Sequence, residues 1–276
     1  MSDQARLSVY GASGFVGTRF CRLSKHVCEI IPREQREPVS DEILYLISTT
    51  HNYHVFDDLQ KDVDTNLKVF LEVLGKAKER RCRINFISSW FVYGETELPA
   101  REDSICSPKG FYSITKRCAE ELLISFCKTF GLEYRILRLC NVYGPQDTGV
   151  SAKKNALQYL ISRIKASEEV GLYHGGDFYR DYMHVDDVAR AIDLCVEKAP
   201  VNEIINIGSG EKVVFRELMD HAIEVTGSHS KINHTVPPEF HEIVQIKDFY
   251  MDNTKLKNLG FRPEVNLKQG IEALCR

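Results

Sequence analysis

The sequence lacks the features of a membrane-bound or nucleic-acid-binding protein. In its 276 residues no apolar run approaches the ~20 residues that a membrane-spanning helix needs. Residues 1–4 carry no basic segment leading into an apolar one, so no signal peptide is expected. The formal net charge of −3 leaves no basic excess to attract nucleic acid or an anionic membrane. We therefore expect a cytoplasmic protein that binds neither nucleic acid nor membrane.

Cysteine occurs nine times but never as a C-x-x-C pair. The cysteines lie among apolar neighbours, which is typical of reduced core thiols rather than of a disulfide framework or a metal site. The acidic pair Asp186-Asp187 has no further carboxylates at ligand spacing. We interpret Asp186 as the N-cap of a helix over 188–198. The sequence therefore predicts no metal.

Short apolar runs alternate with helical patterns through the first half of the chain. Buried strands are predicted at 7–10, 27–32, 42–48, 84–88 and 134–139. Helices are predicted at 62–81 and 112–131. The first of these is interpreted as a crossover helix, and it has apolar residues at helical spacing: Val63, Leu67, Phe70, Leu71 and Leu74. This alternation predicts a parallel sheet with helices on both faces.

Two irregularities limit the size of this sheet. Only residues 33–41 separate the second and third predicted strands, which leaves no room for a helix and a further strand. Past Pro145 the pattern becomes irregular, with helices at 156–165 and 215–226 and a short strand at 204–207. We predict an α/β fold, a Rossmann-type doubly wound parallel sheet, somewhat shortened, in residues 1–150. Residues 151–276 are predicted to form a smaller, irregular α+β domain. Short segments of each half are expected to belong to the other domain.

A glycine-rich turn, residues 11–17, follows the first predicted strand directly. Glycines at its first, fourth and seventh positions let backbone N–H groups approach a pyrophosphate, and the helix N-terminus behind them adds partial positive charge. A tight turn with no ligand is the alternative, but the position between a strand and a helix favours a ligand. The predicted cofactor-binding residues are Gly11, Ser13, Gly14, Phe15, Val16 and Gly17.

The end of the second predicted strand bears on the choice of cofactor. An NAD-binding unit usually places Asp or Glu there, to bind the ribose 2′-OH. Here Arg33 and Arg36 follow the strand, with Glu34 between them. A basic group suits the 2′-phosphate of NADP, so NADP is favoured over NAD. Glu34 keeps NAD open, and a solvated loop arginine is the third interpretation.

Tyr112 and Lys116 lie four positions apart and so share one face of a predicted helix. An ammonium beside a phenol favours the ionised phenol, lowering a pKa that starts near ~10. Such a phenol can act as a general acid or base near neutral pH. The pair also occurs by chance on exposed helices. Ser89 favours the catalytic interpretation because it ends a buried strand, where ligand crevices of open α/β sheets form.

Six motifs, in this order and spacing, resemble the extended short-chain dehydrogenase/reductases, specifically their nucleotide-sugar epimerase/dehydratase branch. Three lie in the first half of the chain: G-A-S-G-F-V-G at 11–17, S-S-W-F-V-Y-G at 88–94 and Y-S-I-T-K at 112–116. The other three are R-L-C-N-V-Y-G-P at 138–145, R-D-Y-M-H-V-D-D-V at 180–188 and I-N-I-G-S-G at 205–210. They span the chain from residue 7 almost to its end.

The resemblance implies a role for each matching residue. Ser89 would hydrogen-bond the substrate oxygen, Tyr112 would shuttle the proton, and Lys116 would hold the nicotinamide ribose. Ser48 lies in the stretch that replaces the family's cofactor-contacting H-L-A-A. The substrate would be a nucleotide-diphosphate sugar, bound by Ser89, Trp90, Asn141 and Arg180. Residues 1–150 would bind NAD(P) and residues 151–276 the nucleotide sugar, in a homodimer of the kind common among relatives.

Departures from the family pattern restrict the reaction. Trp90 and Phe91 replace the acidic pair that dehydratases carry after the catalytic serine or threonine, so a 4,6-dehydratase is not expected. His241-Glu242 replaces a second diphosphate-binding arginine, with Lys247 as a possible substitute. The leading hypothesis is an NAD(P)-dependent nucleotide-sugar epimerase acting at C4. The alternatives are an NADPH-dependent reductase of a nucleotide-linked 4-keto-6-deoxy sugar and a non-catalytic NAD(P)- or nucleotide-sugar-sensing domain.

Overall fold

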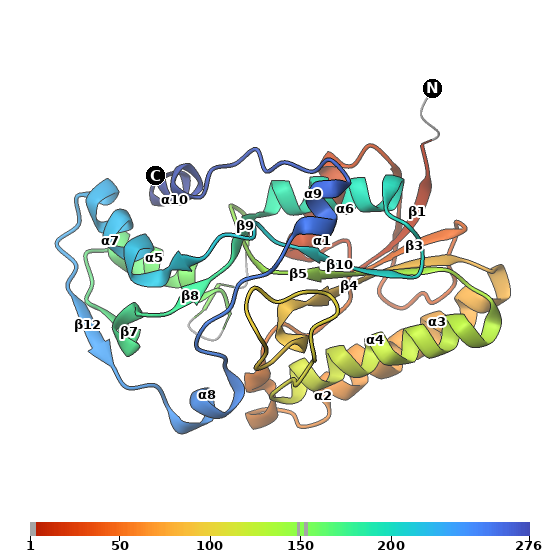
Figure 1. Cartoon of the computed structure of the whole chain (residues 1–276), viewed down its shortest axis with the longest axis horizontal. Coiled ribbons are helices and arrows are strands. Elements are labelled where there is room, and N and C mark those ends of the chain that lie inside the picture. Colours follow the sequence, from red (N-terminus) through yellow and green to blue (C-terminus); the bar gives the residue numbers. More distant parts are fainter. Residues whose placement is uncertain (1–3, 148–149, 152–153) are drawn as a thin grey trace.

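The computed structural model describes residues 4–147, 150–151 and 154–276. A six-stranded sheet lies between two layers of helices, with a smaller group of elements at one end (Figure 1). All its strand pairs are parallel, which confirms the predicted Rossmann-type sheet. In spatial order its strands are β10 (Glu203–Ile207), β5 (Tyr134–Leu139), β4 (Arg83–Ser89), β3 (Glu42–Tyr45), β1 (Arg6–Tyr10) and β2 (Val27–Ile31).

Each face of the sheet is covered by a pair of helices (Figure 1). One face carries α1 (Phe15–Leu23) and α6 (Val185–Lys198), and the other carries α3 (Val69–Arg80) and α4 (Phe111–Phe130). Central strands are therefore buried on both sides, which explains their almost continuous apolar sequence. Helix α4 ends at Gly131, whose φ of 64° is the left-handed conformation that glycine adopts without strain.

The predicted helix over 62–81 contains an irregular turn. It consists of α2 (Lys61–Val63), a π-helical turn η2 (Asp64–Lys68) and α3. Of the apolar residues at helical spacing, Val63 and Leu71 are 45% and 46% exposed. A π turn holds more residues than an α turn, which rotates the apolar stripe. The buried apolar face of α3 is Phe70, Val73, Leu74 and Ala77.

The chain passes from β2 to β3 without a helix, as the short spacing predicted. Residues 32–41 run along the α3 face of the sheet instead. Ser8 Oγ accepts the backbone N–H groups of Val39 and Ser40 at 2.9 Å each, and Tyr10 Oη donates to the carbonyl of Arg36 at 2.7 Å. Strand β2 is consequently the last strand on that side of the sheet, which is the predicted shortening.

Most of the remaining elements form the smaller group, while α9 (Thr254–Asn258) lies beside α6 on the main sheet (Figure 1). Helices α5 (Ala156–Lys165), α7 (Phe215–Thr226) and α10 (Leu267–Cys275) surround a third apolar core with β7 (Val170–Tyr173) and β12 (Ile232–Thr235). The strand predicted at 204–207 is β10, which joins the main sheet although it lies far beyond residue 150. The other short elements are η1 (Asn52–Phe56), η3 (Trp90–Val92), β6 (Asn141–Tyr143), η4 (His174–Gly176), β8 (Tyr179–Arg180), β9 (Tyr182–His184), β11 (Val213–Val214) and α8 (Glu239–Val244).

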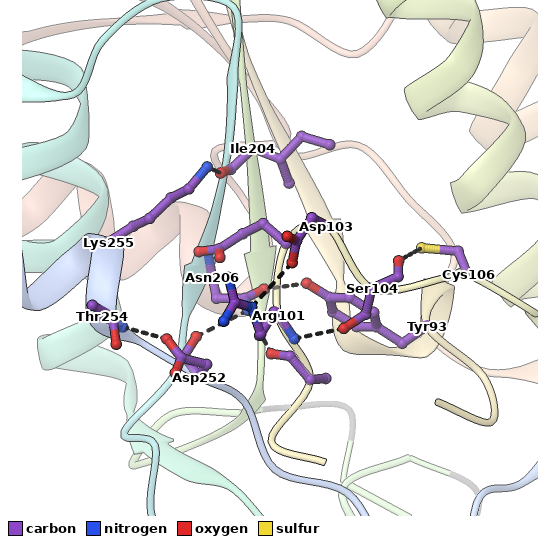
Figure 2. Close-up of polar contacts among 12 residues, drawn as sticks. Tyr93, Arg101, Asp103, Ser104, Cys106, Ile204, Asn206, Asp252, Thr254 and Lys255 are labelled. Carbon is purple, nitrogen blue, oxygen red and sulfur yellow. Dashed lines mark hydrogen bonds and ion pairs between the residues drawn. The ribbon is translucent and has the colours of Figure 1, made fainter. Parts of the chain in front are cut away.

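A buried amide joins segments that are distant in the sequence (Figure 2). The side-chain oxygen of Asn206 accepts from Tyr93 Oη at 2.6 Å, and its nitrogen donates to the carbonyls of Ala100 and Asp252. The backbone N–H of Asn206 donates to Glu102 Oε1 at 3.0 Å. Asn206 is fully buried, and its amide has the partners that burial requires. It thus holds the loop after β4 and a C-terminal segment against β10.

Helix α6 begins three residues earlier than predicted. Its N-cap is His184, whose Nδ1 accepts the backbone N–H of Asp186, so the assignment of Asp186 as N-cap was wrong. Asp186 instead pairs with Arg19 of α1. The carboxylate of Asp187 accepts the backbone N–H of Glu264 at 2.8 Å. Both carboxylates therefore have structural partners that a motif of two adjacent aspartates does not indicate.

Candidate functional site

A cavity of about 670 Å³ opens where the strands of the sheet end, between the sheet and the smaller group of elements. Its wall brings together predicted residues from five separate motifs: Gly11, Gly14, Phe15, Val16, Gly17, Ser48, Ser89, Trp90, Tyr112, Lys116, Asn141 and Arg180. Three predicted cofactor residues, Ser13, Arg33 and Arg36, are not on that wall. The parallel topology explains the gathering, because the carboxyl ends of all six strands meet at one edge.

A second hollow, of about 750 Å³, lies at the opposite edge of the sheet, where the strands begin. Arginines on its wall already have carboxylate partners. Arg80 bonds to Asp41 at 2.9 Å and Arg83 to Glu133 at 2.6 Å. We interpret this hollow as a solvated ion-pair groove, and the predicted site residues do not lie in it.

The glycine turn requires glycine at two positions because its backbone is closely packed. Gly11 has a φ of +83°, which residues other than glycine rarely adopt. A Cβ on Gly17 would lie 2.4 Å from the carbonyl oxygen of Gly11, a clash with backbone. Helix α1 begins immediately behind the turn, with no acidic residue in its first turn. The turn therefore fits the pyrophosphate of a dinucleotide.

Tyr112 stands in the first turn of α4, buried at the cavity wall. Burial raises the pKa of Tyr112, and hydrogen bonds to Ser89 and Ser48 partly oppose that rise. The ring of Phe91 lies edge-on to the Tyr112 ring at 5.7 Å. The structure thus brings Ser48, Ser89 and Tyr112 together around one phenol oxygen. A hydroxyl pair beside a phenol is suited to holding a substrate oxygen while its proton moves.

Lys116 is one turn further along α4 and is also buried. Its Nζ donates to the carbonyl of Ile87 at 2.5 Å and lies 4.1 Å from the centre of the Phe86 ring. Burial lowers the pKa of Lys116 to about 7, although Glu120 favours the charged form. We had expected the ammonium to lower the pKa of Tyr112. The structure shows no such effect, because the ammonium is engaged by Ile87 and Phe86 and is itself disfavoured by burial.

Lys116 predicts a pH dependence of stability. Its pKa is about 7 in the folded chain, against ~10.4 for an unfolded lysine. Between these values the unfolded chain binds more protons, so the free energy of unfolding should rise with pH, by up to ~1.4 kcal/mol per unit. Urea unfolding from pH 7 to about 8.5 measures this slope as a difference from the Lys116→Met variant, because unfolded thiols also titrate near ~8.5 and affect both proteins alike. The Lys116→Met variant should lose this contribution. Equal slopes in both proteins would mean that Lys116 keeps its ordinary pKa.

A polar network behind α4 was missed by the sequence analysis. Asn66, in the π turn, donates to Thr115 Oγ1 at 2.9 Å and to Thr49 Oγ1 at 2.8 Å. Its side-chain oxygen accepts the backbone N–H of Thr49 at 2.8 Å. Thr49 also donates to the buried carboxylate of Asp62. The network fixes the loop after β3 to α4. Polar residues at positions 62 and 66, on the inner side of the predicted helix, were the available signal.

The far wall of the cavity carries a half-buried cation. Among the described residues the guanidinium of Arg180 bonds to backbone carbonyls, those of Tyr179, Ile246 and Lys247, rather than to a carboxylate. It also lies 4.7 Å from the centre of the Phe178 ring. Burial lowers the pKa of Arg180, so its charge is poorly solvated in the protein alone. An anionic ligand would compensate that charge directly.

Asn141 and Trp90 complete the predicted substrate wall. Asn141 Nδ2 donates to the carbonyl of Asp181 at 3.1 Å, so its amide is held at the cavity wall by β8–β9. Trp90 is almost fully buried between the rings of Phe91 and Phe249, at 4.0 Å and 4.6 Å. It therefore belongs to the apolar core as well as to the wall.

A contact between η1 and α8 borders the cavity on its open side. Tyr53 Oη lies 2.9 Å from His241 Nδ1, and the ring of Phe240 contacts those of Tyr53 and Phe56. Burial lowers the pKa of His241 to about 4, so this side chain is neutral at pH 7. His241 therefore does not replace the charge of the arginine that relatives carry there. Lys247 also lines the cavity and can supply that charge.

A sequence model described as the NAD dependent epimerase/dehydratase family matches residues 34–208, more than half of the chain. The chain belongs to this family. The match begins after the glycine turn at 11–17, so that turn is assigned from its own geometry. The residues on the site wall between Ser48 and Arg180 lie inside the matched range.

Curated relatives in the family catalyse different reactions, judged by their names. A Methanocaldococcus jannaschii protein provisionally named as a UDP-glucose 4-epimerase is 31% identical over 66% of this chain, but the match spans only 57% of that protein. The low-salt glycan biosynthesis protein Agl12 of Haloferax volcanii is 28% identical over 85% of this chain and 74% of its own. A dTDP-glucose 4,6-dehydratase of Streptomyces griseus is 26% identical over 84% of this chain and 70% of its own.

Solved structures share the whole fold at low identity. The UDP-N-acetylglucosamine 4-epimerase of Methanobrevibacter ruminantium has a TM-score of 0.88 and 22% identity, covering 100% of this chain and 98% of its own. RMD of Pseudomonas aeruginosa, complexed with NADPH, has a TM-score of 0.84 and 24% identity, covering 99% of this chain and 98% of its own. At these identities the likeness establishes the fold and leaves the reaction open.

Membrane-spanning and metal-binding features were also sought in the part of the chain that the structure describes. None of its helices is long and apolar enough to cross a membrane. In the same residues, no group of three or more His, Cys, Asp or Glu side chains could hold a metal ion. The nine cysteines are all free thiols, five buried and four half-buried.

Proposed function

We propose that this chain transfers hydride between NAD(P) and C4 of a nucleotide-diphosphate sugar, as an epimerase. The observation that carries the proposal is the order of groups along one cavity. The glycine turn follows β1. Ser89 ends β4, two strands away, where Lys116 bonds to the carbonyl of Ile87, and Arg180 comes from β8, outside the six-stranded sheet. This order matches a dinucleotide, a reacting sugar and a diphosphate laid end to end. Family membership supports the same class of substrate.

In this mechanism Tyr112 moves the proton. In its ionised form, a minor population because burial raises its pKa, Tyr112 takes the proton of the C4 hydroxyl while Ser89 donates a hydrogen bond to the same oxygen; the C4 hydride leaves, so that a 4-ketone forms. A bound nicotinamide supplies the hydride acceptor and returns the hydride. After the sugar turns over, the hydride adds to the opposite face of C4 and Tyr112 gives the proton back. Lys116 is placed to hold the ribose, and Arg180 to hold the diphosphate.

A second candidate uses the same residues in one direction only, as an NADPH-dependent reductase of a nucleotide-linked 4-keto-6-deoxy sugar. One observation favours it: the cavity wall takes no residue from 18–45, so the adenosine end of a cofactor is open to exchange. We propose no dehydratase step, because Trp90 and Phe91 are stacked on each other where a dehydratase carries acids. Dehydratases do occur among the relatives.

The reaction is tested by its redox balance. Purified protein would be incubated with UDP-, dTDP- and GDP-sugars and added NAD, and the products would be identified by proton NMR. An epimerase should form the C4 epimer with no net change in absorbance at about 340 nm, where reduced nicotinamides absorb. One NADPH consumed per keto-sugar reduced would identify the reductase instead. If the protein bound nucleotide sugar but turned it over neither with NAD nor with NADPH, the non-catalytic sensing domain would be the remaining hypothesis.

Exposed apolar side chains support the expected homodimer. They lie on the α3–α4 layer: Ile114 is 50% exposed near the start of α4 with Phe111, and Leu71 on α3 is 46% exposed. Exposed apolar side chains of this kind are typical of a protein interface. A contact through Ile114 leaves the cavity open, because Ile114 lies on the opposite side of α4 from Tyr112 and Lys116.

A further inference from the structure

The cavity has a wall for only part of a dinucleotide. On the glycine-turn side its wall passes directly from Gly17 to Leu46. The whole of the intervening segment, residues 18–45, is described, and it contributes nothing to the wall. In a doubly wound sheet the adenosine of the cofactor lies over the ends of the strands beyond the first, in the direction of β2. This is the side on which the present sheet stops.

Strand β2 forms an open edge at this position. It pairs only with β1, and its Val27 and Ile30 are 42% and 64% exposed. A further crossover would ordinarily supply both a strand beside β2 and a loop above it. Here the chain leaves β2 through a tight turn in which the N–H of Gln35 donates to the carbonyl of Pro32 at 3.0 Å. An adenosine placed here would therefore have protein on one side and water on the other.

The loop that follows is held away from the cavity by its own contacts. The Arg36 guanidinium bonds to Glu72 of α3 at 2.7 Å and to the carbonyl of Arg33 at 2.7 Å. Glu37 is paired with Lys76, also of α3, at 3.4 Å. Arg36, which the sequence suggested as a ligand of the 2′-phosphate, thus already has a carboxylate partner on the α3 face of the sheet. That assignment loses its support.

We infer that the chain holds its nicotinamide cofactor chiefly by the nicotinamide–ribose and pyrophosphate half, and that the cofactor exchanges with solution between turnovers. Affinity follows the surface that a ligand buries, and the adenosine half buries little here. Two consequences follow. Discrimination between NAD and NADP is weak, since the 2′-position faces solvent. Either direction of the proposed reaction requires cofactor in the medium. The inference rests on the proposed hydride-transfer function.

Binding without turnover tests this inference. Trp90 is the only tryptophan and lines the cavity, so its fluorescence reports on ligands there. Gel-filtered protein would be titrated with NADH, NADPH and reduced nicotinamide mononucleotide, which lacks the AMP half. We expect the three dissociation constants to agree within about tenfold. We also expect no nicotinamide to remain bound after gel filtration. NADH binding more than about tenfold tighter than the mononucleotide, or cofactor retained through purification, would overturn the inference.

Matched variants locate the contacts. Gly17→Ala should weaken all three ligands, because its Cβ enters the phosphate turn. Arg36→Ala and Glu72→Ala break the same ion pair, but only the first removes a cation. Both should leave the ratio of NADPH to NADH affinity unchanged. A lower ratio in Arg36→Ala alone would show that Arg36 binds the 2′-phosphate and would contradict the inference.

The same titration separates this inference from the proposed function. If a dinucleotide binds tightly and the protein transfers hydride, only the inference is wrong. If none of the three nicotinamides binds at millimolar concentration, the hydride-transfer function is itself contradicted.

Discussion

Replacing Tyr112 with phenylalanine is expected to lower kcat by a hundredfold to ten-thousandfold, roughly the range that general acid–base groups contribute. The substitution removes the phenol proton and keeps the ring, which packs edge-on against Phe91. Substrate binding should change little, because the proposed diphosphate contact is Arg180 on the far wall. Steady-state kinetics on the substrate found by the redox assay measure kcat, and titration with the same nucleotide sugar measures binding.

Tyr45 offers a matched control for this experiment. It is a fully buried tyrosine in β3, and its hydroxyl has no hydrogen-bond partner among the described residues. Tyr45→Phe removes an equivalent oxygen from the same sheet and should leave kcat unchanged. If Tyr112→Phe turned over as fast as Tyr45→Phe, the proton shuttle assigned to Tyr112 would be wrong. A sensing domain would then remain as an interpretation of the geometry of the cavity.

The largest expected loss of stability comes from Glu120, one turn beyond Lys116 on α4. Its carboxylate pairs with both Nε and Nη2 of Arg138, at 3.0 Å and 2.7 Å, and both side chains are almost completely buried. Glu120→Leu would leave the Arg138 guanidinium buried without its carboxylate. Breaking a buried pair in this way costs about 3–5 kcal/mol, a large part of the stability of most domains. Urea unfolding measures the change.

The neighbouring residue provides the control. Glu121 also pairs with an arginine, Arg117, but its side chain is more than half exposed. Glu121→Leu should cost less than about 1 kcal/mol, because exposed ion pairs are weak. The double variant Glu120→Leu/Arg138→Met should recover much of the loss, since it leaves no buried charge unpaired. Equal destabilisation by Glu120→Leu and Glu121→Leu would show that the buried pair has no special role.

Glu120 also connects stability with the site. It favours the charged form of Lys116, whose pKa is otherwise lowered by burial. Losing the carboxylate should therefore lower the fraction of charged Lys116 at neutral pH. The sequence contains Glu120 only as one polar residue in a long amphipathic helix. Its importance depends on Arg138, which reaches it from β5, eighteen residues further along the chain.

Local patterns were sufficient to predict most of the architecture. Buried parallel strands have almost continuous apolar sequence, and helices repeat their apolar residues every three or four positions. Helices α5 and α7 and strand β5 begin and end where the sequence predicted. The short 33–41 spacing also predicted the missing crossover. Chain length alone excludes a helix and a strand between β2 and β3, whatever the rest of the molecule does.

Predictions failed where the outcome depended on a distant partner. The N-cap of α6 differs from the predicted one. His184, at the end of β9, caps the helix, and Asp186 instead pairs with Arg19 on α1. The predicted helix over 62–81 is irregular because Asn66 lies in a π turn, where it bonds to Thr49 and Thr115. Arg36 is held by Glu72, thirty-six residues away. Each of these contacts is made by tertiary packing, and no local pattern records it.

The sequence by itself determined the parallel sheet, its shortening and the gathering of the glycine turn, Ser89, Tyr112 and Lys116 at one edge. These follow from strand direction and loop length, which are local properties of the chain. Only the tertiary structure decided how the site is charged. Burial raises the pKa of Tyr112 and lowers that of Lys116, and Arg180 is left facing the cavity. The environment of an ionisable group is set by everything packed around it, and that packing exists only once the chain is folded.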